Sequence, residues 1–251
     1  MIVGLLHPGS GLGNMLHRYI ATRIKALELG VDFSMINPEG FKGREFMNLG
    51  MGKPNNIKFH IEQGTGKIIP HSDLPLWEEW DKQVFDPDFD FVKDNTIIDG
   101  NFEDERYFGD YLYEISEWLD TKWLSVPDDV CVIGFRGGEF YTVPELGLPK
   151  EYFDRAIIEM KKINPIMKFE VHTDDPELAK QFFPNDKIIH DIDINWRSMR
   201  YAKYAIISNS SFYILPRLLN GGLTIAPRYF NRYNVKRWDY PQSYYKSFQY
   251  I

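Results

Sequence analysis

The sequence predicts an α/β fold made of two halves, each built on a parallel sheet. In residues 126–228, short apolar runs alternate with segments of helical spacing. At the start of the chain, an apolar run, a glycine-rich turn and an amphipathic helix follow one another. The 251 residues allow one large or two small domains, and the 43% of hydrophobic residues can form a core.

Residues 1–125 form the first predicted half, which opens as a β-loop-α-β unit. The helix of this unit has Met15, Leu16 and Tyr19 at helical spacing, and Gly30 ends it. The expected elements are a strand at 2–6, that helix, a strand at 31–36, loops and short elements over 38–95, a strand at 96–99 and a helix over 105–123.

Residues 126–228 form the second half, in which strands and helices alternate regularly. The expected strands are 130–135, 168–172, 188–189, 205–208 and 223–226, and the expected helices are 149–163, 176–183, 195–201 and 210–219. The aromatic tail at 229–251 is expected to pack back on the first half.

The composition excludes several classes of protein. The net charge of -7 gives no basic footprint, so nucleic acid is not an expected partner. Cys131 is the one cysteine and lies in an apolar run, which indicates a core residue and no intrachain disulfide. We expect no signal peptide, because no basic region precedes the apolar run at residues 2–6, and no apolar stretch approaches the ~20 residues of a membrane helix. We expect a cytoplasmic protein.

The turn at residues 9–14 is the first candidate site. Its glycines allow close approach of a ligand to the backbone, and the helix that follows favours anions. Gly11, Gly13 and Asn14 are the candidate binding residues. A turn that merely needs positive φ angles is one alternative. A dinucleotide site of an NAD-type oxidoreductase is another, although the glycine spacing and the place of Asp32 fit it poorly.

A second candidate follows the strand expected at 130–135. Arg136, Gly137, Gly138 and Glu139 form a turn at the carboxyl end of this strand, where α/β folds bind ligands. The guanidinium of arginine is a rigid fork of donors that suits phosphate oxygens. The alternative is a surface salt bridge between Arg136 and Glu139.

Two further polar turns follow expected strands. Asp174 and Asp175 suit hydrogen bonds from a base or ribose, or Asp175 is an ordinary helix N-cap. Asn209, Ser210 and Ser211 suit a diphosphate, or they are plain helix caps. Together the three turns occupy the carboxyl edge of one predicted sheet, which favours a nucleotide-type ligand over a purely structural role.

These motifs resemble those of the α-1,2-fucosyltransferases. The similar blocks cover most of the chain in the family's order: Gly11-Leu12-Gly13-Asn14, Gly100-Asn101-Phe102-Glu103-Asp104-Glu105-Arg106-Tyr107-Phe108, Phe135-Arg136 with Gly138-Glu139-Phe140, Thr173-Asp174-Asp175-Pro176-Glu177, and Ile206-Ile207-Ser208-Asn209-Ser210-Ser211-Phe212.

The resemblance implies a GT-B-type fold of two Rossmann-like halves and an inverting transfer from a GDP-sugar, with fucose as the expected sugar, to a glycan hydroxyl. It implies no metal and no cofactor beyond that co-substrate. Arg136 would neutralise the leaving phosphate, and Gly138, Asp174, Asp175, Asn209, Ser210 and Ser211 would bind the donor. Gly11, Gly13 and Asn14 would line the cleft from the first, acceptor-side half.

The chain departs from the family's motif at named positions. The motif histidine is Gly134 here, the second arginine is Gly137 and the aspartate is Glu139. The family's Ser-Phe-Ser-Trp-Trp is Ser211-Phe212-Tyr213-Ile214-Leu215. Two hypotheses follow: a glycosyltransferase in which Glu139 is the general base, or a catalytically degenerate protein that binds a nucleotide-sugar or a glycan. The sequence assigns no oligomeric state.

Overall fold

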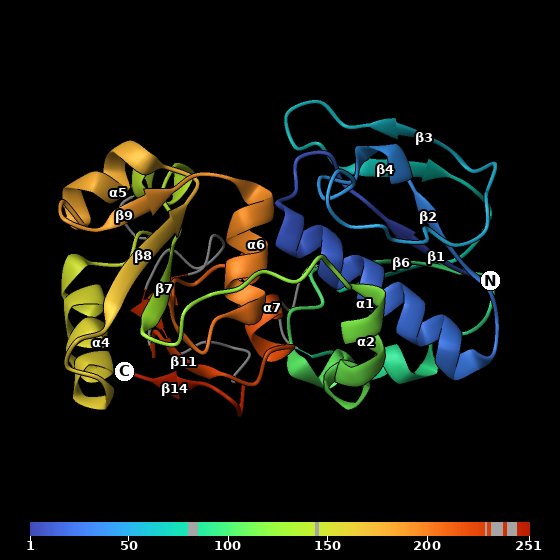
Figure 1. Cartoon of the computed structure of the whole chain (residues 1–251). Coiled ribbons are helices and arrows are strands. Elements are labelled where there is room, and N and C mark those ends of the chain that lie inside the picture. Colours follow the sequence, from blue (N-terminus) through green and yellow to red (C-terminus); the bar gives the residue numbers. More distant parts are fainter. Residues whose placement is uncertain (80–84, 144–145, 229, 232–237, 240–244) are drawn as a thin grey trace. The chain divides into compact units, whose positions relative to one another are not determined.

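The computed structural model describes residues 1–79, 85–143, 146–228, 230–231, 238–239 and 245–251. Backbone contacts divide the chain into two units, Met1–Asp120 and Thr121–Ile251. This division falls slightly before the predicted boundary at 125/126. Each unit contains a parallel sheet with helices, so the predicted α/β fold of two Rossmann-like halves is confirmed (Figure 1).

The first unit is built on the sheet β2-β1-β6-β5, in which every neighbouring pair is parallel. Its strands are β1 (Ile2–Leu5), β2 (Phe33–Ile36), β5 (Leu76–Glu78) and β6 (Thr96–Asp99). Helix α1 (Leu12–Leu29) connects β1 to β2, and Gly30 ends it with φ 65°. The chain leaves β1 toward β2 and later returns on the other side at β6, so the strand order reverses between β1 and β6.

Short elements surround this sheet, as expected for residues 38–95. They are the 3-10 turns η1 (Pro38–Gly40) and η2 (Pro87–Phe91) and the antiparallel hairpin of β3 (Lys58–Ile61) and β4 (Ile68–His71). Strand β5 was not predicted individually. It has only three residues and contains no apolar run that would predict a strand. It lies at the edge of the sheet, and Leu76 is exposed there.

The prediction of one helix over 105–123 was wrong. The structure has two 3-10 turns, η3 (Glu105–Tyr107) and η4 (Gly109–Tyr111), and then a short helix α2 (Leu112–Trp118). Phe108, with φ -147° and ψ -6°, separates the turns. Tyr107 is buried against Phe89 and Phe102, with ring centroids 5.1 and 5.3 Å away. Tertiary packing of these aromatic side chains therefore overrides the helical spacing of the segment.

The second unit is built on the sheet β14-β11-β10-β7-β8-β9, which is also parallel throughout. Its strands are β7 (Val130–Phe135), β8 (Lys168–Thr173), β9 (Lys187–Ile189), β10 (Tyr204–Ile207), β11 (Leu223–Ala226) and β14 (Gln249–Tyr250). Its helices are α3 (Glu139–Thr142), α4 (Lys150–Ile163), α5 (Pro176–Phe182), α6 (Ile192–Tyr201) and α7 (Ser211–Leu218). Here the strand order reverses between β7 and β10.

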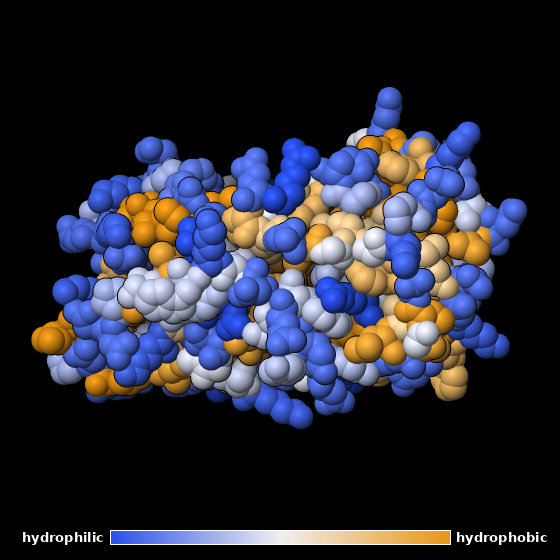
Figure 2. Space-filling model, turned by 45° about the vertical axis from the view of Figure 1, so that its right-hand side comes forward, coloured by the Kyte–Doolittle hydropathy of each residue, from blue (hydrophilic) through white to orange (hydrophobic). Residues whose placement is uncertain are grey.

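The core of the second unit lies against the apolar strands. All six residues of β7 are buried. Phe135 packs on Phe153 of α4 and Phe182 of α5, with ring centroids 5.4 and 5.0 Å away. Cys131 is buried in this core, as expected, and burial raises the pKa of its thiol. On the face shown in Figure 2, apolar surface forms separate patches among hydrophilic residues.

The aromatic tail at 229–251 differs from its prediction at its end. Strand β14 pairs with β11, so the last residues complete the sheet of the second unit. The short strands β12 (Phe230–Asn231) and β13 (Trp238–Asp239) pair with each other, and residues 229, 232–237 and 240–244 lie outside the described part. Packing of the remaining tail on the first half stays a prediction. None of the helices in the described ranges is long and apolar enough to span a bilayer.

Candidate functional site

Three polar turns meet at one edge of the second sheet. β10, β7 and β8 are neighbouring parallel strands, so the turns that follow them lie side by side (Figure 1). The turns are 136–138, 174–175 and 208–210. β7 and β10 are the strands between which the order reverses, which is where open α/β sheets bind ligands. The predicted grouping of these turns is confirmed.

Arg136 lies in the middle of this edge and contacts two carboxylates. Its Nη1 donates to Asp174 Oδ2, and its Nη2 donates to Glu139 Oε1 at 2.9 Å. Its guanidinium also lies 5.2 Å from the centre of the Phe140 ring. The salt bridge with Glu139, which was the alternative to a ligand site, is therefore present. The structure adds a second ion pair, because Arg136 also binds the carboxylate of Asp174, which follows β8.

The aspartates of the second turn bind the Gly-Gly turn. The Gly137 amide donates to Asp174 Oδ1 at 2.8 Å, and the Gly138 amide donates to Asp175 Oδ2 at 3.0 Å. Asp175 also accepts from Leu178 N at 3.0 Å, so the alternative that Asp175 is an ordinary helix N-cap is confirmed for α5. The carboxylate of Asp174 thus lies in an anion site formed by a guanidinium and a backbone amide.

The third turn, at residues 208–210, holds the turn at residues 136–138 through a hydrogen bond. The hydroxyl of Ser208 is buried and accepts from Arg136 N at 3.1 Å. Ser210 occupies the N-cap position of α7, but its side chain makes no capping bond. Ser211 begins α7, and the Asn209 side chain donates to Leu146 O at 3.4 Å. The plain-cap alternative therefore does not hold for Ser210, which is buried at the N-terminus of α7, and a helix N-terminus favours anions.

Two glycines close to Arg136, one in strand β7 and one in the turn, have no room for a side chain. A Cβ on Gly134 would lie 2.7 Å from Cγ of Tyr213, and a Cβ on Gly137 would lie 2.4 Å from Cβ of Asp175. Tyr213 is buried and donates from its hydroxyl to His172 O at 2.8 Å. The ring of Tyr213 thus fills the space that the family's motif histidine would need at position 134.

His172 is the buried titratable group beneath the site. Its Nδ1 bonds Asn195 Oδ1 at 2.9 Å, and its Nε2 has no hydrogen-bond partner among the described residues. Burial lowers the pKa of His172 to about 4. The imidazole is therefore neutral at physiological pH and adds no positive charge for a phosphate.

Gly11, Gly13 and Asn14 belong to the other unit. Gly11 is the N-cap of α1, with an ordinary φ of -67°, and a Cβ on it would meet nothing within 4 Å. The turn alternative that needs positive φ does not hold for Gly11. Gly13 lies in the first turn of α1, where its carbonyl accepts from the buried His17 Nδ1 at 2.9 Å. Their place in a cleft stays a prediction.

A buried ionic cluster in the first unit escaped the sequence analysis. His7 Nε2 donates to Asp99, with its oxygens at 2.8 and 2.9 Å, and His7 Nδ1 accepts from Ile68 N at 2.8 Å. Arg18 Nε lies 3.5 Å from Asp99 and donates to Gly100 O at 2.8 Å. The cluster lies where the first sheet reverses its strand order, at the carboxyl ends of β1 and β6.

A second buried carboxylate lies near this cluster. Glu79 Oε2 accepts from Asn101 N at 2.7 Å and Phe102 N at 3.1 Å, and burial raises its pKa to about 7. The sequence contained one signal for His7 and Asp99, which is their position at strand ends. His7 directly follows one apolar strand run, and Asp99 ends another. Within the described ranges, no three His, Cys, Asp or Glu side chains are grouped to hold a metal ion.

Comparisons with known proteins give distant structural similarity only. No protein-family model matches the sequence, and no curated protein matches it. The chain is similar to the crystal structure of the fucosyltransferase NodZ from Bradyrhizobium, with 12% identity, coverage of 87% of this chain and 92% of that chain, and a TM-score of 0.45. NodZ α-1,6-fucosyltransferase soaked with GDP-fucose gives 12% identity, 87% and 91% coverage and a TM-score of 0.42. These structures do not single out the α-1,2 family.

Proposed function

We propose that this protein transfers a sugar from a GDP-sugar donor to a glycan hydroxyl and that Arg136 binds the donor diphosphate. One observation carries the proposal: the Arg136 guanidinium and the Gly137 amide already bind a common anion, the Asp174 carboxylate, at the point where the sheet reverses. The resemblance of the motifs to α-1,2-fucosyltransferases supplies the reaction class and the expected sugar.

The proposed chemistry follows from this arrangement. When the bond between sugar and diphosphate breaks, negative charge grows on the leaving phosphate, and a cation held in place lowers the barrier. The diphosphate would displace the carboxylates from Arg136. For Glu139, which is 58% exposed, this exchange costs little, because exposed ion pairs contribute only about 0.2–1 kcal/mol. Ser210 and Ser211 at the start of α7 would bind the second phosphate.

Glu139 is the proposed general base, and the transfer is proposed to be inverting and to need no metal. In the structure Glu139 is 58% exposed and its Oε1 lies 2.9 Å from Arg136 Nη2. Once a diphosphate takes Arg136, Glu139 would be released to accept the proton of the acceptor hydroxyl.

A second function has its own support. The Gly137 and Gly138 amides and Arg136 are all satisfied by Asp174, Asp175 and Glu139. A turn so fully paired is suited to a protein that has lost catalysis and binds a nucleotide-sugar or a glycan. Turnover of the donor distinguishes the two functions, because only the glycosyltransferase would release GDP from a GDP-sugar.

The test is an assay of the purified full chain with GDP-fucose, other GDP-sugars, UDP-sugars and NAD. We expect GDP release from a GDP-sugar by hydrolysis or by transfer to glycan acceptors. Arg136→Ala should abolish it, whereas Arg155→Ala, which removes an exposed arginine of α4, should not. Saturable GDP binding without turnover would support the binding protein, and hydride transfer with NAD would contradict both functions.

A further inference from the structure

Two histidines of the β3–β4 hairpin face each other in the first unit. His60 lies on β3 and His71 on β4, and His60 Nδ1 is 2.8 Å from His71 Nε2. The centres of the two rings are 5.1 Å apart, and both side chains are exposed. Eleven residues separate the histidines along the chain, so only the pairing of the strands brings them together.

The register of the hairpin places both histidines on its solvent face. Lys58 lies opposite His71, and His60 lies opposite Ile69. Opposite residues of paired strands, and residues two apart on one strand, share a face, so the side chains at 58, 60, 69 and 71 are all on the same side. His60 and His71 are therefore diagonal neighbours, which aromatic side chains can bridge.

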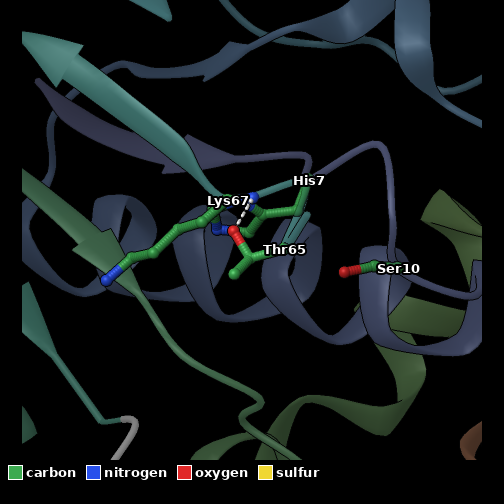
Figure 3. A pocket seen from close by; sticks show the side chains of 4 residues that line it. All are labelled: His7, Ser10, Thr65 and Lys67. Carbon is green, nitrogen blue, oxygen red and sulfur yellow. Dashed lines mark hydrogen bonds between the residues drawn. The ribbon is translucent and has the colours of Figure 1, made fainter. Parts of the chain in front are cut away.

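The backbone that carries the two histidines is fixed on the other face and in the turn. Phe59 and Ile68 pack in the core of the first unit, and Ile68 N donates to Nδ1 of the buried His7 at 2.8 Å. In the turn, Thr65 Oγ1 accepts from Lys67 N at 3.1 Å (Figure 3). A ligand that binds both histidines therefore does not have to order the hairpin first.

The distance between the two ring nitrogens suits a shared metal ion. Bonds between imidazole nitrogen and Zn²⁺ measure about 2.0–2.1 Å, so two bonds of this length at a right angle place their nitrogens roughly 2.9 Å apart. A tetrahedral angle would need roughly 3.3 Å. The 2.8 Å between His60 and His71 matches the right angle, which is the angle between neighbouring ligands in the square-planar and tetragonal sites of Cu²⁺ and Ni²⁺.

Both rings can offer a lone pair to the same ion. In the hydrogen bond between them, one ring donates a proton to the other. On metal binding this proton moves to the outer nitrogen of its own ring, so both imidazoles stay neutral and no proton is lost from the pair. The rings are exposed, and the torsion that rotates an imidazole has a broad minimum, so a small rotation directs both lone pairs to one point.

The neighbouring charges set the strength of such a site. Lys58 lies opposite His71, and its positive charge opposes a bound cation, but it is exposed and screened by water and salt. Among the described residues, no third His, Cys, Asp or Glu joins the pair. Water would therefore fill the remaining coordination positions.

We propose that His60 and His71 form a surface site for one divalent transition-metal ion, with Cu²⁺ and Ni²⁺ preferred. The imidazoles supply two neighbouring ligands and the ion links β3 to β4. Cu²⁺ binds more tightly than Ni²⁺ or Zn²⁺, and Mg²⁺, which requires oxygen ligands, does not bind. The site goes beyond the proposed function and does not depend on it.

Calorimetric titration of Ni²⁺ into the full chain, without an affinity tag, tests this site. We expect one ion per chain, and His60→Ala and His71→Ala should each weaken binding at least about tenfold, since even residues behind metal ligands contribute that much. His190→Ala, which removes an exposed histidine of the second unit, should leave binding unchanged, and Mg²⁺ should give no saturable binding. With one equivalent of Cu²⁺, electron paramagnetic resonance should show two imidazole nitrogens on the ion.

Urea unfolding gives a second readout. Ni²⁺ should raise the unfolding midpoint of the wild type and of His190→Ala but not of His60→Ala, because the ion binds the paired strands in preference to the unfolded chain. The site is refuted by an absence of saturable Ni²⁺ binding or by wild-type affinity in His60→Ala and His71→Ala. A Cu²⁺ spectrum with fewer than two imidazole nitrogens would also refute it, because the two rings would then form only a hydrogen bond.

Discussion

Arg136 pairs with two carboxylates, and these two partners have different roles at the site. Arginine holds anions through a planar fork, and here the fork is shared between Asp174 and Glu139. The two partners differ in setting. Asp174 also bonds the Gly137 amide, whereas Glu139 is largely exposed on the four-residue helix α3. Asp174 therefore fixes the turn, and Glu139 is the partner that is free to take a chemical role.

Glu139→Gln tests that role. We predict that turnover with a GDP-sugar falls about 100-fold or more, as expected when a general base is lost. GDP binding should not weaken, because the substitution removes a negative charge that competes with the diphosphate. Turnover and GDP affinity are measured separately, and Asp174→Asn is the comparison that disturbs the turn itself. Full turnover of Glu139→Gln would reduce Glu139 to an ion-pair partner.

Strand β7 and helix α7 are fitted to each other at Gly134 and Tyr213. The chain differs from the resembled family at both positions, where the family has histidine and serine. In the structure the two positions are in contact, because the Tyr213 ring occupies the space beside Gly134. The packing of Tyr213 at Gly134 therefore supports the end of β7, from which the turn with Arg136 continues.

This fit predicts an energetic coupling between the two positions. Gly134→His should lower the free energy of unfolding by about 1–3 kcal/mol, the usual cost of overpacking. Tyr213→Ser should also destabilise, through a cavity and the lost bond to His172 O. In the double variant the losses should be non-additive by at least about 0.5 kcal/mol, measured by urea unfolding. Strictly additive losses would show that the two side chains do not share the space.

At the scale of elements, the sequence predicts best where burial and periodicity agree. α4 begins at residue 150 and ends at 163, almost as expected, and β7 is entirely apolar and entirely buried. α6 begins at Ile192, earlier than expected, because Asp191 caps it through Ile194 N. The segment 105–123 misled because its apolar spacing serves an aromatic cluster and not a helix face.

At the scale of the whole molecule, buried histidine couples stability to pH. The pKa of His172 is about 4 in the folded chain and 6.5 as its ordinary value, so the unfolded chain binds the proton more readily. The stabilisation is fully present above pH 6.5 and is lost progressively as the pH falls toward 4. The burial of His17 acts in the same direction.

We predict that the free energy of unfolding falls between about pH 7 and pH 4.5, with up to about 3 kcal/mol from His172. Urea unfolding across this range gives the slope. His172→Gln should have a flatter slope than the wild type, since the group that titrates is gone. Parallel slopes for the two proteins would contradict the account of His172.

The sequence predicts the candidate site only to the extent that it predicts where strands end. Each polar turn follows an apolar strand run, so its place at the sheet edge can be read from the sequence. The contacts cannot, because Arg136 meets Asp174 and Gly134 meets Tyr213 only through the strand order and register. The buried cluster of His7, Asp99 and Arg18 depends in the same way on β1 lying beside β6.

The most direct test of the account is a calorimetric titration of GDP into the full chain and into Arg136→Ala, with UDP and ADP as comparison ligands. Arg136→Lys, which keeps the charge and loses the fork, and Arg155→Ala serve as controls. The account predicts saturable binding of GDP, loss of at least about tenfold in affinity in Arg136→Ala, a smaller loss in Arg136→Lys and none in Arg155→Ala. Equal GDP affinity in the wild type and Arg136→Ala, or no GDP binding by the wild type, would contradict it.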